Sequence, residues 1–433
     1  MGSFSTPLSG LVAAQGQLQS VSNNLANIDT DGYKDQTLTF NDIYSQAGES
    51  NGAGDPIQTG SGVAVSSTTS DFTEGNLNAT GTSSNMAISG NGFFVTQAPG
   101  GLLDYTRAGD FTTNNAGQLT TPNGELVLGY PAVLGVVNPG ATLQPLQVGS
   151  GVTIPAQVST TIGVTANLNS NTGPGGTAPS STLSAYDSLG QSHTLTVNYT
   201  MTAPNTWNYT VTVPSADLTG ATGTNWTVGS GTLNFNSTGT LASITNVVPI
   251  SLGGPGSPAV VGPPAIPAVP ATALADGATS PQALAGPFGT AANPTITQTA
   301  APSATSATTT DGFASGTLST YSVQPDGTIE GTFTSGNTLA LGQVAVASFA
   351  NNEGLVSIGN NNYQPTAASG AGVIGTAGTG GRGTIVGGNV EQSNVDIAAE
   401  FAKLIVAQQA YSANAKSITA FNQVSQATIA MIQ

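Results

Sequence analysis

This sequence contains very few charged residues. Only 6% of the 433 residues are Asp, Glu, Lys or Arg, whereas a typical soluble domain has about 25%. Five residues are basic and the net charge is −16. Nucleic-acid binding needs a basic surface and docking on anionic membranes needs clusters of Lys and Arg. The composition therefore argues strongly against both kinds of partner.

Cysteine is absent, and there is a single histidine, His193. Without thiols there is no disulfide, Cys nucleophile or thiolate metal site, and one imidazole leaves most triads and metal sites unavailable. A lone histidine in an alternating strand pattern is more often packed or at the surface than functional. Carboxylate pairs of the glycosidase kind remain, but Asp29/Asp31 and Asp104/Asp110 lie in turn contexts. We expect a non-enzymatic protein with no catalytic residue, metal or cofactor.

Long apolar runs are missing too. No run approaches the ~18 residues that a membrane span needs, and the N-terminus lacks the basic and apolar regions of a cleavable secretory signal. We therefore expect no membrane insertion. If the protein is exported, we expect a route that keeps the N-terminus.

Apolar residues near the N-terminus recur at alternating spacings of three and four. This is the heptad pattern of a helix that packs against another helix. Thr6 and Pro7 form a start signal, so we predict a helix over residues 7–28, about 33 Å long. Its apolar positions are Leu11, Ala14, Leu18, Val21, Leu25 and Ile28.

The last forty residues repeat this pattern. Ser393 or Asn394 is the expected N-cap, and Asp396 suits the first turn. A helix of about 38 residues would extend about 57 Å. We expect one broad apolar stripe along it, formed by Ile397, Phe401, Leu404, Ile405, Tyr411, Ile418, Phe421, Val424 and Ile432.

Neither predicted helix can bury its stripe alone. The simplest arrangement pairs the two helices with each other and with copies in neighbouring subunits; an ordinary two-helix hairpin on a globular body is the alternative. The uncharged polar surface leaves the same choice open, because it suits either solvent or an interface core, which is depleted of charge.

The middle of the chain predicts β structure, with alternating runs such as 193–199 and 207–213 between Gly- and Asn-rich turns. We expect a mixed α and β fold: paired, coiled-coil-like terminal helices plus nested, discontinuous, mainly antiparallel β domains. Residues 251–310 are rich in Pro, Ala, Gly and Thr and predict a surface insertion rather than a core element. The predicted domains are 1–35 with 388–433, 36–150 with 326–387, and 151–325.

Three stretches resemble one family. The first ends in Val21-Ser-Asn-Asn-Leu-Ala-Asn-Ile-Asp-Thr-Asp-Gly-Tyr-Lys34, the second contains Ile88-Ser-Gly-Asn-Gly-Phe-Phe-Val95, and the third starts Ser393-Asn-Val-Asp-Ile. Together they resemble the bacterial flagellar axial family of rod, hook and hook-associated proteins, over roughly the first 130 and last 90 residues. Chain length and residues 345–355 resemble the hook branch. The motif residues are Asn23, Asn24, Asn27, Gly32, Tyr33 and Lys34.

The resemblance implies a structural subunit that leaves the cell unfolded through the flagellar type III export apparatus. It would polymerise beneath a hook cap into a helical, hollow tube outside the cell, a universal joint that transmits motor torque to the filament. Its partners would be copies of itself, the distal rod and the hook–filament junction proteins. The terminal helices would line a central channel and carry the polymerisation contacts.

Other functions remain open at this point. A distal-rod or hook-associated protein is the alternative within the family. A surface adhesin or S-layer-like protein would explain the acidic, Thr- and Asn-rich middle, but not the two heptad ends. An extracellular glycosidase would need a carboxylate pair in a cleft.

Overall fold

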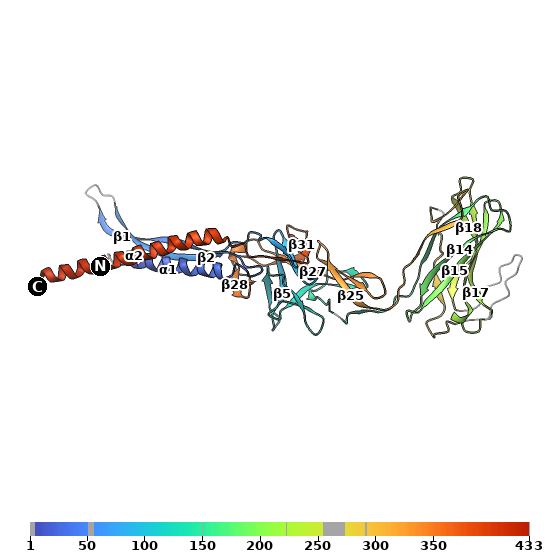
Figure 1. Cartoon of the computed structure of the whole chain (residues 1–433), viewed down its shortest axis with the longest axis horizontal. Coiled ribbons are helices and arrows are strands. Elements are labelled where there is room, and N and C mark those ends of the chain that lie inside the picture. Colours follow the sequence, from blue (N-terminus) through green and yellow to red (C-terminus); the bar gives the residue numbers. More distant parts are fainter. Residues whose placement is uncertain are drawn as a thin grey trace. The chain divides into compact units, whose positions relative to one another are not determined.

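The computed structural model describes residues 5–50, 56–149, 151–221, 223–253, 273–290 and 292–432 (Figure 1). It is mostly β with two terminal helices, and its sheets are almost entirely antiparallel, which confirms the predicted mixed class. Two compact units form: Met1–Val152 with Ser319–Thr332 and Thr338–Gln433, and Thr153–Leu318 with Phe333–Asn337. We call them the terminal unit and the outer unit. Within the described ranges, neither helix is long and apolar enough to cross a membrane.

The two helices of the terminal unit, α1 (Ser5–Ala26) and α2 (Ile397–Ile432), lie side by side and run antiparallel (Figure 1). Near one end, Asn24 Nδ2 donates to Glu400 Oε2 over 3.2 Å. Near the other, a Cβ added at Gly10 would lie 2.9 Å from the side chain of Asn414. Glycine therefore allows α1 to approach α2 closely, and the last turns of α2 extend beyond the described end of α1.

Both helices begin differently from the prediction. α1 already includes Ser5, so Thr6 is inside the helix rather than its N-cap. Asp396 caps α2, because its Oδ1 accepts from Ala398 N at 2.8 Å and from Ala399 N at 3.2 Å. The prediction of Ser393 or Asn394 as the cap is wrong, since Asn394 binds other segments of the chain instead.

A long hairpin follows α1, formed by β1 (Gln36–Ser50) and β2 (Pro56–Ser70). It lies along the helix: Val63 N donates to Ser9 Oγ over 3.1 Å, and Ser20 Oγ donates to Gln36 O over 2.8 Å. Its register shifts several times. Sequence patterning did not identify this hairpin, because its strands show no regular alternation of apolar and polar residues.

The β body of the terminal unit has two central strands that are buried on both faces, β5 (Phe93–Gln97) and β27 (Thr338–Ser348). Phe94 and Val346 pack into one apolar cluster, and Phe93 and Ala347 into another on the opposite side. Continuous apolar runs are typical of such strands. β9 (Leu126–Val133) pairs with both of them. On the β27 side the sheet continues through β26 (Thr328–Phe333) to β25 (Gly316–Val323), and on the β5 side through β6 (Leu103–Thr106) and β29 (Asn362–Gln364) to β28 (Val356–Gly359). Short strands at the edges are β7 (Thr112–Thr113), β8 (Leu119–Thr120), β10 (Val136–Val137), β11 (Gln144–Pro145) and β30 (Val373–Thr376).

Two short antiparallel pairs bring the C-terminal segment back to the N-terminal one. β31 (Thr384–Gly387) pairs with β4 (Met86–Ser89), and β32 (Asn389–Glu391) pairs with β3 (Leu77–Ala79). These ladders place Glu391 beside the residues that follow α1, which creates the site described below.

The outer unit packs two main sheets around one apolar core. The larger sheet is fully antiparallel, with β14 (Thr177–Tyr186), β15 (Ser192–Ala203), β16 (Thr206–Pro214), β17 (Asn225–Phe235) and β18 (Leu241–Val248). The smaller sheet has β13 (Ile162–Asn169) between β23 (Ile296–Thr299) and β24 (Ala304–Thr310), and β13 and β23 are parallel. The runs predicted at 193–199 and 207–213 are strands, and their alternate residues, such as Val197 and Trp207, are fully buried.

The Pro- and Ala-rich tract differs from its prediction where it is described. Residues 254–272 lie outside the described residues. From residue 273 on, Leu274, Phe288 and Ile296 are buried in the outer core. The short strands of this part of the chain are β20 (Gln282–Leu284), which pairs with β19 (Ile250–Leu252), and β21 (Gly289–Thr290), which pairs with β22 (Asn293–Pro294). This half of the tract belongs to the core because its few large apolar residues, although widely spaced, all face the sandwich.

Candidate functional site

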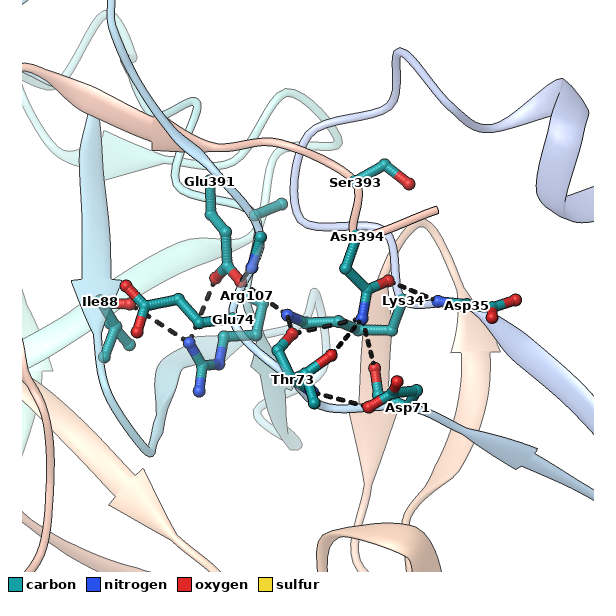
Figure 2. A network of polar contacts seen from close by, with 12 residues as sticks. Lys34, Asp35, Asp71, Thr73, Glu74, Ile88, Arg107, Glu391, Ser393 and Asn394 are labelled. Carbon is teal, nitrogen blue, oxygen red and sulfur yellow. Dashed lines mark hydrogen bonds and ion pairs between the residues drawn. The ribbon is translucent and has the colours of Figure 1, made fainter. Parts of the chain in front are cut away.

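The two ends of the chain are joined by a buried polar network centred on Glu391 (Figure 2). Lys34 Nζ donates to Glu391 Oε1 over 2.6 Å, and Arg107 Nη1 donates to Oε2 over 3.1 Å. Gly75 N also donates to Oε1, over 2.9 Å. The three charged side chains are no more than 1% exposed. One carboxylate therefore holds together three segments that are distant in sequence.

Backbone carbonyls and one aromatic ring complete the surroundings of the two cations. Lys34 Nζ donates to Thr73 O over 2.6 Å. Arg107 donates to Ile88 O over 3.2 Å and to Gly90 O over 2.7 Å, and its guanidinium carbon lies 5.5 Å from the centroid of the Phe93 ring. A flat guanidinium can use its fork of donors and stack on an aromatic face at the same time. Lysine at position 107 could not reproduce these contacts.

Asn394 makes a second set of bonds just before α2 (Figure 2). Its Oδ1 accepts from Asp35 N over 2.8 Å, and its Nδ2 donates to Asp71 O over 2.9 Å and to Thr73 O over 3.2 Å. The side chain thus connects the segment after α1 with the segment after β2. This is the role that replaces helix capping at Asn394.

The Asn-rich end of α1 forms a third cluster, centred on the buried Asn24. Its Nδ2 donates to Asp35 Oδ1, to Gln36 O over 3.0 Å and to Glu400 Oε2 over 3.2 Å. Its Oδ1 accepts from Tyr33 OH over 3.1 Å and from Gln36 N over 3.0 Å. Asn24 satisfies both ends of its amide here, which an apolar or charged residue could not do.

The remaining motif residues shape the turn between α1 and β1. Asn27 Nδ2 donates to Asn23 O over 2.8 Å, and Asn23 Nδ2 donates to Tyr33 OH over 3.2 Å. Gly32 has a φ of 70°, and an added Cβ would lie 2.4 Å from Ala108 N. Its N–H donates to Glu391 O over 2.6 Å. Gly32 is therefore required both by its backbone conformation and by a close approach.

Burial shifts the ionisation of several of these groups. Desolvation lowers the pKa of Lys34, and the opposing attraction of Glu391 does not cancel this shift. Desolvation, with the nearby charges of Asp35 and Glu400, raises the pKa of Tyr33 to about 12. Burial also raises the pKa of Asp35, although Lys403, 3.6 Å away, opposes the shift. The network is thus built from ionic groups held in a largely dry environment.

Chemically, this arrangement is a clamp rather than a reaction centre. Its carboxylate is saturated by two cations and a backbone amide, so it is not poised to abstract a proton. Desolvation offsets much of the attraction in a buried ion pair, but removal of one partner typically costs about 3–5 kcal/mol because the other charge is left buried. The network therefore fixes where the two ends of the chain meet.

The predicted helix positions are placed as follows. On α1, Ala14 and Val21 are buried, whereas Leu11, Leu18 and Leu25 are half-buried. The helix ends at Ala26, so Ile28 lies in the turn that follows it rather than in the predicted helix, and is half-buried there. On α2, Leu404 and Ile418 are half-buried, and the exposed stripe positions are Ile397, Phe401, Ile405, Tyr411, Phe421 and Val424. Glu400, Ala407 and Asn414 also lie toward α1.

Sequence reasoning missed Glu391, Arg107, Glu400 and Ala407. The ion pair between Lys34 and Glu391 joins residues 357 positions apart, so no local pattern reveals it. One signal was available: in a chain with only five basic residues, each charge is unusual, and Arg107 lies within the first 130 residues, over which the chain resembles the axial family.

Four family models match this chain, at its two ends and through its middle. The matches are described as flagella basal body rod protein (residues 4–34), flagellar hook protein FlgE/F/G D1 domain (87–167), flagellar basal body protein FlaE D2 domain (158–313) and flagellar basal body rod FlgEFG protein C-terminal (386–431).

Relatives extend this match over nearly the whole chain. The flagellar hook protein FlgE of Escherichia coli (strain K12) is 34% identical over 441 residues, which cover 97% of this chain and 98% of the relative. The chain belongs to the flagellar hook protein family. The FlgE protein of Treponema pallidum (strain Nichols) is also 34% identical, with 96% of each chain covered.

A solved hook protein has a similar fold. The crystal structure of Helicobacter pylori flagellar hook protein FlgE2 matches with a TM-score of 0.52 at 15% identity, covering 73% of this chain and 100% of that chain. The hook protein family is structural rather than enzymatic, which confirms the expectation of a non-enzymatic subunit.

Proposed function

We propose that this chain is the structural subunit of a bacterial flagellar hook, and that it polymerises through its terminal helices into a helical, hollow tube. The tube would act as a universal joint that transmits motor torque to the filament. One observation carries the polymerisation step: the last turns of α2 leave large apolar side chains in solvent. The chain belongs to a family of hook proteins, so identical copies are the natural cover for this surface.

The exposed side chains at the end of α2 include Val424, Ile429 and Met431, which are 63%, 57% and 80% exposed. Complete burial of one such side chain contributes about 1.5–3 kcal/mol, so several of them supply a substantial driving force. Contacts between different surfaces of identical subunits generate helical assemblies when they do not close into a ring. A neighbouring copy is therefore the partner that this surface fits.

The helix pair itself would act as a short, coiled-coil-like seam. Glu400, Leu404, Ala407, Asn414 and Ile418 follow the spacing of three and four residues that coiled coils use. Leu11, Ala14, Leu18, Val21 and Leu25 of α1, with Ile28 just after its end, would form the matching side. We propose that Ile397, Phe401, Tyr411 and Phe421 lie toward neighbouring subunits, and that the buried network keeps the pair in register for assembly.

The proposed domain layers are 1–35 with 388–433 innermost, 36–150 with 326–387 next, and 151–325 outermost. The proposed setting is extracellular, in the hook, after export through the type III apparatus and beneath a hook cap. The proposed partners are identical copies, the distal rod and the hook–filament junction proteins. The family membership and the helical ends of the chain support this assignment.

Sedimentation of assembled material tests the proposal. The full chain is compared with a chain that lacks residues 419–433, which removes the exposed turns and leaves the network around Glu391 intact. We expect the full chain to form material that pellets and the shortened chain to stay monomeric and folded. Equal pelleting of both chains would contradict the assigned role of α2.

A further inference from the structure

The single histidine lies at the centre of a cluster that the hook role does not explain. His193 is 3% exposed at the start of β15, in the outer unit. Its Nε2 lies 3.1 Å from Asp187 Oδ2 and 3.9 Å from Asp276 Oδ2, and its Nδ1 lies 3.1 Å from Asp217 Oδ2. Three carboxylates therefore surround one imidazole in a chain where charge is scarce.

Backbone amides fix the orientation of two of these carboxylates. Asp187 Oδ1 accepts from Leu189 N over 2.8 Å and from Gln191 N over 2.9 Å. Asp276 Oδ1 accepts from Ala278 N over 3.0 Å. In each residue one oxygen is thus held by the backbone, while Oδ2 faces the imidazole.

The same oxygens approach each other as well as the ring. The ligand atoms of Asp187, His193 and Asp276 all lie within 4.8 Å of each other. Two carboxylates repel at this separation unless a proton or a cation lies between them. Zn²⁺ binds N and O ligands at about 2.0–2.2 Å, so its ligand atoms must lie close to one another. The three atoms of this cluster meet that condition.

We propose that His193 Nε2, Asp187 Oδ2 and Asp276 Oδ2 bind one divalent transition-metal ion of the Zn²⁺ class. The imidazole favours such a metal over Ca²⁺ or Mg²⁺, which prefer oxygen ligands. Asp217 supplies the carboxylate that accepts the Nδ1 proton and orients the ring, as is usual behind a metal-bound histidine. Entry is open, because Asp276 is exposed.

Bound metal would join the segment of Asp187 and His193 to that of Asp276, and Asp217 is linked to them through its contact with His193. Asp187 lies in the turn between β14 and β15, Asp217 in the short helix η1 (Ser215–Asp217), and Asp276 in the segment that follows residue 272. A ligand that binds only the folded form stabilises it. The site would therefore raise the stability of the outer unit, in contrast to the expectation from sequence that the chain holds no metal.

Protons compete with a metal at any such site, because an imidazole binds a metal ion only in its deprotonated form. Binding of Zn²⁺ is therefore expected to release protons.

Zinc titration of the full chain, stripped beforehand with a chelator, tests the proposal by calorimetry. We expect one Zn²⁺ per chain, proton release on binding, and an increase in the melting temperature of the outer unit but not of the terminal unit. Asp276→Asn should weaken binding about tenfold or more, and His193→Gln should abolish it. The control Glu353→Gln removes the same charge at an exposed residue and should leave binding unchanged.

His193 is buried, so His193→Gln could prevent folding. Asp276 is at the surface, so Asp276→Asn is expected to fold and still tests the site. Absence of stoichiometric binding to the folded chain at neutral and mildly alkaline pH would overturn the proposal. Binding that is equally tight in the folded Asp276→Asn variant would also overturn it. Neither result would bear on the hook role, since assembly is assigned to the other unit.

Discussion

The terminal unit and the outer unit handle apolar surface in opposite ways. In the described part of the outer unit, Leu189 and Val247 are the only large apolar side chains that are exposed, and most of the others belong to one core. The terminal unit keeps Ile405, Val424, Met431 and many more in solvent. The outer unit is therefore complete as a monomer, whereas the terminal unit has a surface that suits further copies.

The two units also differ in what their interiors contain. The outer unit buries His193 with the carboxylate of Asp187, which is only six positions away in the chain. The terminal unit buries two cations and a carboxylate where its chain ends meet. Buried ions are costly to desolvate and stabilise weakly overall, but they penalise wrong arrangements strongly. This contrast indicates that the terminal unit relies on its network for correct placement of the helices.

The largest effect is expected for Glu391→Gln. The change leaves Lys34 and Arg107 buried without their counter-charge, at a cost of about 3–5 kcal/mol. Thermal unfolding followed by circular dichroism should show an earlier transition for the terminal unit and an unchanged one for the outer unit. The control is Glu353→Gln. A terminal transition that does not move would contradict the clamp.

The complementary experiment removes a large buried side chain from the core of the outer unit. Trp207→Ala should destabilise the outer unit by about 3–5 kcal/mol, because a fully buried aromatic side chain leaves a cavity. Denaturant unfolding should show the outer transition shifted while the terminal one stays. If both transitions shift equally, the two units do not unfold independently.

A smaller effect is expected at Gly32, for which Gly81 is a matched control. Both have a φ of 70°, but a Cβ at Gly81 would meet nothing within 4 Å, whereas at Gly32 it would meet the backbone of Ala108. Gly81→Ala should cost about 1–2 kcal/mol from its left-handed conformation alone. Gly32→Ala should cost more, as measured by chemical denaturation. Equal costs would show that the turn adjusts without strain.

The smallest effects concern alkaline pH. The pKa of Tyr33 and that of Tyr199 are both raised to about 12, chiefly by burial. A raised pKa contributes stability below the ordinary value near pH 10, and that stability is lost as the pH rises from 10 to 12. Tyr33→Phe should flatten this loss for the terminal transition and Tyr199→Phe for the outer one. If neither variant changes how stability falls between pH 10 and 12, the two tyrosines do not cause that loss.

Local sequence patterns predicted the helices and several strands, because these depend on the spacing of nearby residues. The heptad positions gave both helices, and alternation gave β15 and β16. The Asn-rich motif marked Asn24 and Lys34, which do lie in the network. The partners of these residues could not be predicted, because Glu391 and Glu400 approach them only after two short ladders bring the chain ends together. The burial of Ala407 was not predicted either, because a small residue that allows a close approach of α1 leaves no large apolar signal in the sequence.

Electron microscopy tests the assembly role of the end of α2 most directly. The variant Val424→Asp with Ile429→Asp places charge on exposed apolar positions, and the control Gln423→Asp with Gln426→Asp adds the same charge at exposed polar positions of the same turns. The account predicts hollow tubes for the unmodified chain and the control, and folded monomers for the apolar variant. Normal tubes formed by the apolar variant would contradict the account.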